Sequence, residues 1–160
     1  MRIDFEKMPD NARLWIYQAD RDLSELDSNK IKEKLEPFLE SWAAHGQELI
    51  TAYTLKYNRF LMIAVDQESI PPSGCSIDAS VRVIQDVQNQ LNLDFFNRMD
   101  ICFKNERGEV ESLKMNDFRK MLKEINHPEK LLVFNNLIQS KSELDAWEVE
   151  AQNSWHKQWL

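Results

Sequence analysis

The sequence predicts an α+β fold, with a mainly antiparallel sheet and helices packed against it. Short apolar runs typical of strands alternate with longer segments in which apolar residues recur at helical spacing. Two of the strand-like runs are separated only by "KYNR", as in an antiparallel hairpin. The 160 residues suffice for one core and are too few for two of ordinary size. We therefore expect a single domain over 1–160, with 1–12 as a lead-in and 148–160 as a tryptophan-rich tail packed on it.

The first two elements are a strand and a helix. The stretch "RLWIYQA" (13–19) contains Trp, Ile and Tyr, which are enriched in strands. The stretch "DSNKIKEKLEPFLESWAAHG" (27–46) has its apolar residues on one helical face. Asp27 or Ser28 is suited to cap the start of this helix, and Gly46 is suited to end it.

Two strands and a second helix follow. The stretch "ELITAYTLKYNRFLMIAVD" (48–66) contains both strands, and its run "FLMIAV" is apolar throughout, as expected at the centre of a sheet. The stretch "SIDASVRVIQDVQNQLNLDFF" (76–96) predicts an amphipathic helix capped by Ser76 or Asp78. Its expected buried stripe consists of Ile77, Val81, Ile84, Val87 or Gln88, and Leu91.

The last third of the chain predicts a second set of strands and helices. In "RMDICFK" (98–104), Met, Ile and Phe alternate with a second set that includes Cys102, which is typical of a half-exposed strand. The remaining elements are a hairpin partner at 109–115, a helix at 116–125 capped by Asn116 or Asp117, a strand at 130–138 and the start of a last helix at 140–147.

The order of these elements is β-α-β-β-α-β, followed by a β-α-β extension. The first six match the split βαβ, or ferredoxin-like, arrangement. In that arrangement the end of the first helix, "ESWAAHG", and the start of the second, "SGCSID", meet at the same edge of the sheet. We therefore expect Trp42 and His45 to lie near Cys75, Ser76 and Asp78, although they are far apart in the chain.

This edge is the predicted functional site. The first amides of a helix carry partial positive charge, and the loop "PPSG" exposes those of the second helix. Such a turn binds small anions or carboxylates. The leading hypothesis is a non-enzymatic, small-ligand or anion-binding domain, without a metal or another cofactor. The predicted ligand-binding residues are Trp42, His45, Gly74, Cys75, Ser76 and Asp78.

Two alternative functions stay open. Cys75 at a helix start, with His45 nearby, has the residue types of a thiol enzyme in which Cys75 is the nucleophile and His45 the base. Each residue also has a structural interpretation, with Cys75 packed under the proline loop and His45 at a helix terminus. The third function is a protein-interaction module that uses the tryptophan-rich tail. In the corresponding structural interpretation, the tail closes over the core.

Absent motifs exclude several classes of enzyme. With glycine only at positions 46, 74 and 108, there is no phosphate-binding P-loop and no GxGxxG dinucleotide loop. There is also no GxSxG elbow and no HExxH zinc motif. His45, Cys75, Asp78 and His156 are acceptable zinc ligands by type, but they lack CxxC or HxxxH spacing. No metal site is therefore predicted.

Composition bears on partners and location. The net charge of −7 argues against binding to nucleic acid, which requires clustered Lys and Arg. No apolar run reaches about 18 residues, and the first fifteen residues include acidic residues where a signal peptide has its apolar core. No membrane partner and a cytoplasmic location are therefore predicted, with both cysteines as free thiols. An exposed edge of the sheet would allow a homodimer.

Several stretches together resemble a small bacterial family of uncharacterised proteins that are often labelled "ABC transporter ATPase". These stretches are "WIYQADRDLS", "FLESWAAHG", "FLMIAVD", "SGCSIDASV", and "LLVFNNLI" with the later "SWH". The most specific pieces are Trp42-x-x-His45-Gly46 and the run from Ser73 to Asp78. The resemblance spans nearly the whole chain and implies no activity, because none is established for that family. The ATPase label does not carry over, since the chain has neither a P-loop nor an LSGGQ signature.

Overall fold

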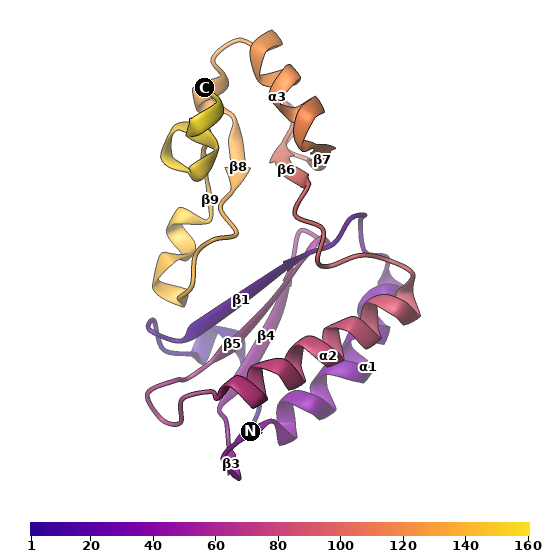
Figure 1. Ribbon diagram of the computed structural model, residues 1–160, viewed down its shortest axis with the longest axis vertical. Coiled ribbons are helices and arrows are strands. Elements are labelled where there is room, and N and C mark those ends of the chain that lie inside the picture. Colours follow the sequence, from indigo (N-terminus) through magenta and orange to yellow (C-terminus); the bar gives the residue numbers. More distant parts are fainter. The chain divides into compact units, whose positions relative to one another are not determined.

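The computed structural model describes residues 1–160 and is an α+β fold with antiparallel sheets, which confirms the predicted fold class (Figure 1). The chain divides into two compact units. Unit 1 comprises Met1–Phe96 and Gln139–Ser142, and unit 2 comprises Asn97–Ile138 and Glu143–Leu160. The expectation of one domain over the whole chain stays a prediction. None of the helices combines the length and the apolar character needed to cross a bilayer.

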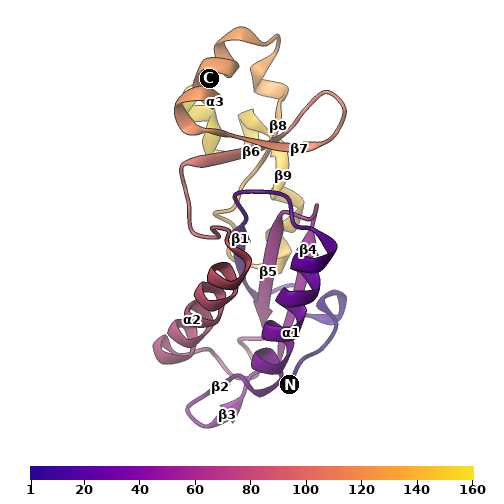
Figure 2. The same ribbon diagram turned by 90° about the vertical axis from the view of Figure 1, so that its right-hand side faces the viewer.

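Unit 1 is a three-stranded antiparallel sheet with two helices on one face. Its strand order is β1-β5-β4, and α1 and α2 lie side by side against the sheet (Figures 1 and 2). The two predicted strands around "KYNR" are confirmed as β4 and β5. In chain order, the elements are η1 (Phe5–Lys7), β1 (Arg13–Gln18), α1 (Glu25–Ser41), β2 (Ala43–Ala44), β3 (Gln47–Glu48), β4 (Thr51–Lys56), β5 (Phe60–Val65) and α2 (Gly74–Leu91).

The central strand β5 is the most buried element of unit 1. All six of its side chains are buried, as its uninterrupted apolar sequence predicts. On the helical side of the sheet, its alternate residues pack with apolar residues of both helices. Full burial of each such side chain contributes about 1.5–3 kcal/mol. This cluster includes Leu61, Ile63 and Val65 of β5, Ile31, Leu35 and Leu39 of α1, and Ile84, Val87 and Leu91 of α2.

The boundaries of α1 differ from the prediction. Its N-cap is Ser24, whose hydroxyl accepts from the amide of Asp27, while the Asp27 carboxylate accepts from the amide of Ser24. The predicted caps, Asp27 and Ser28, are therefore wrong. The helix ends at Ser41 and not at Gly46. His45 and Gly46 both have positive φ, 52° and 76°, and form the two-residue turn of the β2–β3 hairpin.

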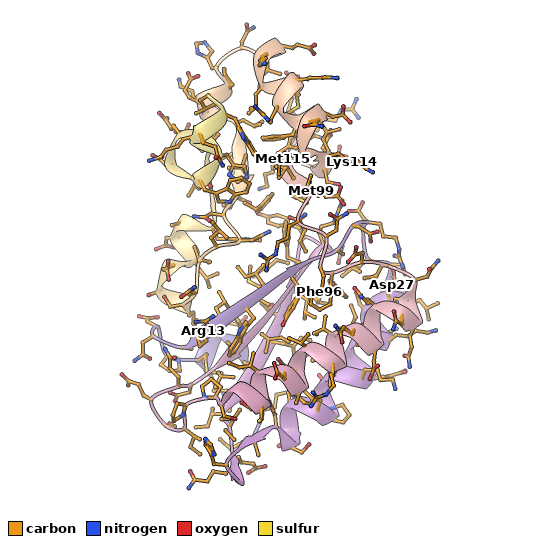
Figure 3. The ribbon with its side chains drawn as sticks, viewed as in Figure 1. Arg13, Asp27, Phe96, Met99, Lys114 and Met115 are labelled. Atoms are coloured by element: carbon orange, nitrogen blue, oxygen red, sulfur yellow. The ribbon has the colours of Figure 1, made fainter.

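The side chain of Arg21 ties the start of α1 to the end of α2. Its guanidinium donates to Asp27 Oδ2 at 2.6 Å and to the main-chain oxygen of Leu91 at 2.7 Å. Figure 3 shows Asp27 at this end of the helix pair. The hydrogen bond from Arg21 lowers the pKa of Asp27 to about 2, against the opposing effect of burial.

The start of α2 also differs from the prediction. The helix begins at Gly74, and Ser73 and Ser76 form its capping box, so the predicted caps Ser76 and Asp78 are wrong. The expected buried stripe is confirmed at Ile84, Val87 and Leu91, but it is wrong at Ile77 and Val81, because Ser76 and Ser80 lead the buried face. Their hydroxyls can be buried because they donate to the main-chain oxygens of Ser73 and Ile77, respectively.

The strand expected at 98–104 is not part of the sheet of unit 1. It forms β6 (Asp100–Lys104), which pairs with β7 and β8 in the sheet of unit 2. The segment Gln139–Ser142 lies antiparallel to β1 instead. The amide of Leu14 donates to the oxygen of Gln139 at 2.9 Å, and the amide of Lys141 donates to the oxygen of Ala12 at 3.0 Å.

Unit 2 contains a four-stranded antiparallel sheet with the order β7-β6-β8-β9. The predicted hairpin is confirmed as β6 and β7, but Cys102 is buried rather than exposed.

The predicted helix caps Asn116 and Asp117 are wrong, because α3 begins at Met115, whose amide donates to the oxygen of Met99 (Figure 3). The elements after β6 are β7 (Val110–Lys114), α3 (Met115–Glu124), η2 (Pro128–Lys130), β8 (Leu132–Phe134), η3 (Lys141–Ala146), β9 (Glu148–Glu150), η4 (Ala151–Asn153) and η5 (Trp155–Trp159).

The last residues of the chain contribute to the aromatic core of unit 2. His156 is 1% exposed, stacks on Trp155 at a centroid distance of 3.9 Å, and has its Nδ1 2.8 Å from Ser154 Oγ. Phe118 of α3 meets both His156 and Trp159 edge-on, with ring centroids 6.0 Å apart in each pair. Burial lowers the pKa of His156 to about 4. The tail therefore packs on unit 2, with His156 buried and Trp155 and Trp159 half-buried, and its use as an interaction surface stays a prediction.

Candidate functional site

The end of α1 is predicted to lie near the start of α2, and this is confirmed for Trp42 and Ser76. The indole Nε1 of Trp42, which follows α1, donates to the main-chain oxygen of Ser76 at 2.8 Å. Trp42 is buried, and the rings of Phe38 and Trp15 lie 5.2 and 6.0 Å from its ring. The polar atom of this indole is therefore engaged within the protein and not directed at a ligand.

In the first turn of α2, the main-chain amides of Gly74 and Cys75 have no hydrogen-bond acceptor within the protein. The amide of Ser76 donates to Ser73 Oγ, and the amide of Ile77 donates to the main-chain oxygen of Ser73. The amides of Gly74 and Cys75 make no hydrogen bond, and both residues are exposed. Of the predicted site, Gly74 and Cys75 therefore retain amides that could meet an anion.

The remaining predicted site residues are exposed. His45 lies at the tip of the β2–β3 hairpin, which explains why it does not end a helix as expected. Cys75 and Asp78 lie on the first turns of α2. No hydrogen bond joins His45 to Cys75, and the catalytic pair stays a prediction. No group of three or more His, Cys, Asp or Glu side chains in the chain is arranged to hold a metal ion.

Two hollows lie elsewhere in unit 1, and sequence reasoning did not single out their residues. The first, of about 600 Å³, runs along α1, and the second, of about 340 Å³, lies between the N-terminal segment and β4. They share Arg2 and Glu36, and we call them together the N-terminal groove. The α1 part is lined by Arg2, Asn29, Lys32, Glu33, Glu36, Pro37 and Glu40, and the β4 part by Arg2, Ile3, Asp4, Phe5, Glu6, Glu36, Tyr53, Thr54 and Leu55.

Three side chains meet where the two parts of the groove join. The phenol of Tyr53 donates to Glu36 Oε1 at 3.0 Å, and a guanidinium nitrogen of Arg2 lies 3.5 Å from the same oxygen. Burial, together with the hydrogen bond to Glu36, raises the pKa of Tyr53 to about 12. The Nε of Arg2 is buried without an acceptor. The junction thus has a fixed carboxylate and one unsatisfied donor.

The groove is acidic. Its lining carries five carboxylates, those of Asp4, Glu6, Glu33, Glu36 and Glu40, against two cationic side chains, those of Arg2 and Lys32. Glu33 and Glu40 are exposed and make no ion pair. Three of the carboxylates lie at positions 33, 36 and 40, one face of α1. That spacing is the signal by which the sequence indicates this surface.

The outer edge of β4 borders the groove and is only partly covered. The amide of Thr51 donates to the oxygen of Met1 at 2.9 Å, and the amide of Ile3 donates to the oxygen of Thr51 at 2.8 Å. Backbone groups of a strand alternate in direction, so those of Tyr53 and Leu55 point outward as well. They have no strand beside them, because the chain turns into η1 after Asp4.

Comparison with known proteins adds no further constraint on this site. No protein-family model, no curated protein and no solved structure matches the chain. The function is therefore argued from the geometry and charge of the surface alone.

Proposed function

We propose that this protein is a non-enzymatic binding domain whose ligand is positively charged and occupies the N-terminal groove. The single observation that carries this proposal is a hollow surface lined by five carboxylates and only two cations. Opposite charge attracts a ligand into such a surface, and the attraction is screened by salt. Because most of these carboxylates are exposed, each contributes little on its own.

The contacts at the junction favour binding over catalysis. Glu36 accepts a hydrogen bond from Tyr53 and lies beside the guanidinium of Arg2, so the position of its carboxylate is fixed by two neighbours. Tyr53 has a raised pKa and stays protonated, which makes it a hydrogen-bond donor over the physiological range. We infer a preformed recognition surface in which Glu33 and Glu40 provide additional charge.

The test is a calorimetric titration with two cationic probes, spermidine and a pool of capped hexapeptides. In this pool, lysine or arginine occupies alternate positions, and the other positions are randomised among Val, Ile, Thr and Tyr. The double variant Glu33→Gln/Glu40→Gln should weaken binding about three- to tenfold. The matched control, Glu106→Gln/Glu124→Gln, removes the same charge from exposed positions of unit 2 and should leave binding unchanged. Binding of neither probe, or equal binding by both variants, would overturn the proposal.

A small anion at the first turn of α2 is the second candidate, supported by the two amides of Gly74 and Cys75 that lack acceptors. Titration with inorganic phosphate, followed by NMR shifts of these two amides, tests it. Shifts no larger than those of exposed amides elsewhere would exclude the anion site. The thiol enzyme, the homodimer, the cytoplasmic location and the bacterial family stay predictions.

We further propose that unit 1 is a variant of the ferredoxin-like arrangement. The order β1-β5-β4 is that of three of its strands, and two helices on one face fit the same pattern. The fourth strand position, beside β1, is taken by Gln139–Ser142, which comes from much later in the chain than expected.

A further inference from the structure

We propose that the ligand of the N-terminal groove is an extended polypeptide segment with basic side chains, which adds a strand to the outer edge of β4. This inference rests on the proposed function and specifies its ligand class. Binding by strand addition needs a free strand edge, space beside it and side-chain complementarity. Each of these three conditions is met in the groove.

The free edge is provided by Tyr53 and Leu55. The amide of Asp66 donates to the oxygen of Ile50, which fixes Ala52 and Thr54 as the residues of β4 that bond to β5. The amides and oxygens of Tyr53 and Leu55 therefore face away from the sheet. They present two donors and two acceptors at strand spacing, and no other segment of the chain pairs with them.

The space lies in the β4 part of the groove. Its volume of about 340 Å³ is lined by Tyr53, Thr54 and Leu55 of β4 and by residues 3–6, which lead into η1 close to β4. Arg2 and Glu36 line both parts of the groove, so side chains of a bound segment at β4 would lie next to the α1 part.

The chain itself already uses this mode of pairing at the same edge. Met1 and Ile3 flank Thr51 in a short parallel bridge, with hydrogen bonds in both directions. The N-terminal segment then leaves the edge at Asp4, where it turns into η1. A bound segment would occupy the strand position that the chain gives up at this point.

The charge of the groove selects the occupant. A second copy paired through its own β4 would bring Asp4, Glu6 and Glu36 against the same carboxylates, and like charges at such short range disfavour pairing. A segment with Lys or Arg at alternate positions places its cations on one side of the strand, where they can reach Glu33 and Glu40. Edge pairing gives the affinity, and the carboxylates give the preference for basic segments.

The experiment measures amide exchange by NMR in the whole protein, with and without the hexapeptide pool defined above. Tyr53 and Leu55 should exchange about tenfold more slowly when the pool is bound. Ala52 and Thr54 serve as internal controls and should not change, because they bond to β5 in both states. Two further pools carry backbone N-methyl groups, one pool at the odd-numbered residues and the other at the even-numbered residues. In an added strand only one of these two sets of amides faces β4. The pool methylated on that set should lose about tenfold or more in affinity, and the other pool should retain it.

The outcomes separate this inference from the proposed function. If the pool binds and depends on Glu33 and Glu40, but Tyr53 and Leu55 gain no protection or both methylated pools bind equally, strand addition is wrong and the cationic groove stands. If neither spermidine nor the pool binds, both are wrong. If Tyr53 and Leu55 become protected with rising protein concentration alone, the occupant is a second copy, and the inference is overturned.

Discussion

The indole of Trp42 and the main chain of Ser76 are joined by a buried hydrogen bond of 2.8 Å between the end of α1 and the first turn of α2. The bond links two segments that are far apart in the sequence and sets the separation of the two helix ends.

Replacing this indole tests the bond directly. The Trp42→Phe variant keeps an aromatic ring but removes the donor, so a buried oxygen loses a partner. We expect a loss of about 1–3 kcal/mol in the free energy of unfolding, measured by urea denaturation. Trp15→Phe is the matched control, because Trp15 belongs to the same aromatic cluster and makes no hydrogen bond with its indole. Equal losses in the two variants would mean that only packing matters.

The Arg21–Asp27 ion pair predicts a dependence of stability on acid pH. The pKa of Asp27 is lowered to about 2 in the folded protein, from the usual 3.8. The contribution of the pair is therefore fully present above the unfolded value and is lost as the pH falls from about 4 to about 2. The difference in unfolding free energy between the wild type and Asp27→Asn should shrink over this interval. Asp86→Asn, at an exposed position on α2, is the matched control for the loss of one carboxylate.

His156 predicts a second pH dependence, at higher pH. Its folded pKa of about 4 lies below the usual 6.5 because the neutral imidazole is buried. Below pH 6.5 the unfolded chain binds a proton that the folded chain excludes, so stability falls from pH 6.5 to about 4 by up to roughly 3 kcal/mol. The variant His156→Leu should remove this slope from the urea midpoints of unit 2. His127→Gln, which changes an exposed imidazole of the same unit, should retain it.

The two cysteines should differ in accessibility. Cys75 is exposed at the start of α2, and Cys102 is buried within β6. A thiol-reactive dye should therefore modify one cysteine in the native protein and both in denaturant, and Cys75→Ser should abolish the native reaction. Rapid reaction of Cys102 without denaturant would contradict the burial of β6. The pH dependence of the Cys75 reaction also tests the thiol-enzyme hypothesis, since a nucleophile should react well below pH 8.

The sequence predicts the elements of unit 1 well, because their hydrophobic patterns are strong. The apolar run of β5 identifies the central strand, and the approach of Trp42 to Ser76 follows from the order of the elements. The caps Ser24 and Ser73 are missed because each lies upstream of the residues that the apolar period marks. The local signal that identifies these two caps is the capping box, in which Asp27 or Ser76 lies three residues after the N-cap.

Three features depend on tertiary context that a local pattern does not contain. The strand β6 has the correct apolar pattern, but a pattern does not specify which sheet a strand joins. The segment Gln139–Ser142 pairs with β1 through its backbone and has no apolar alternation to reveal it. The N-terminal groove is missed for a similar reason. Arg2, Glu36 and Tyr53 come from three distant segments, and only the spacing of acids on α1 hints at the surface.

The placement of Gln139–Ser142 beside β1 has a consequence for biosynthesis. The chain is made from its N-terminus at about 5–20 residues per second, so β1, β5 and β4 exist some seconds before the segment that covers β1 is translated. During that interval Ala12 and Leu14 present unpaired backbone groups on the nascent chain. The stretch Asn97–Ile138 is synthesised before unit 1 is complete. Slow translation across that stretch would prolong the exposure of this edge to chaperones and to neighbouring nascent chains.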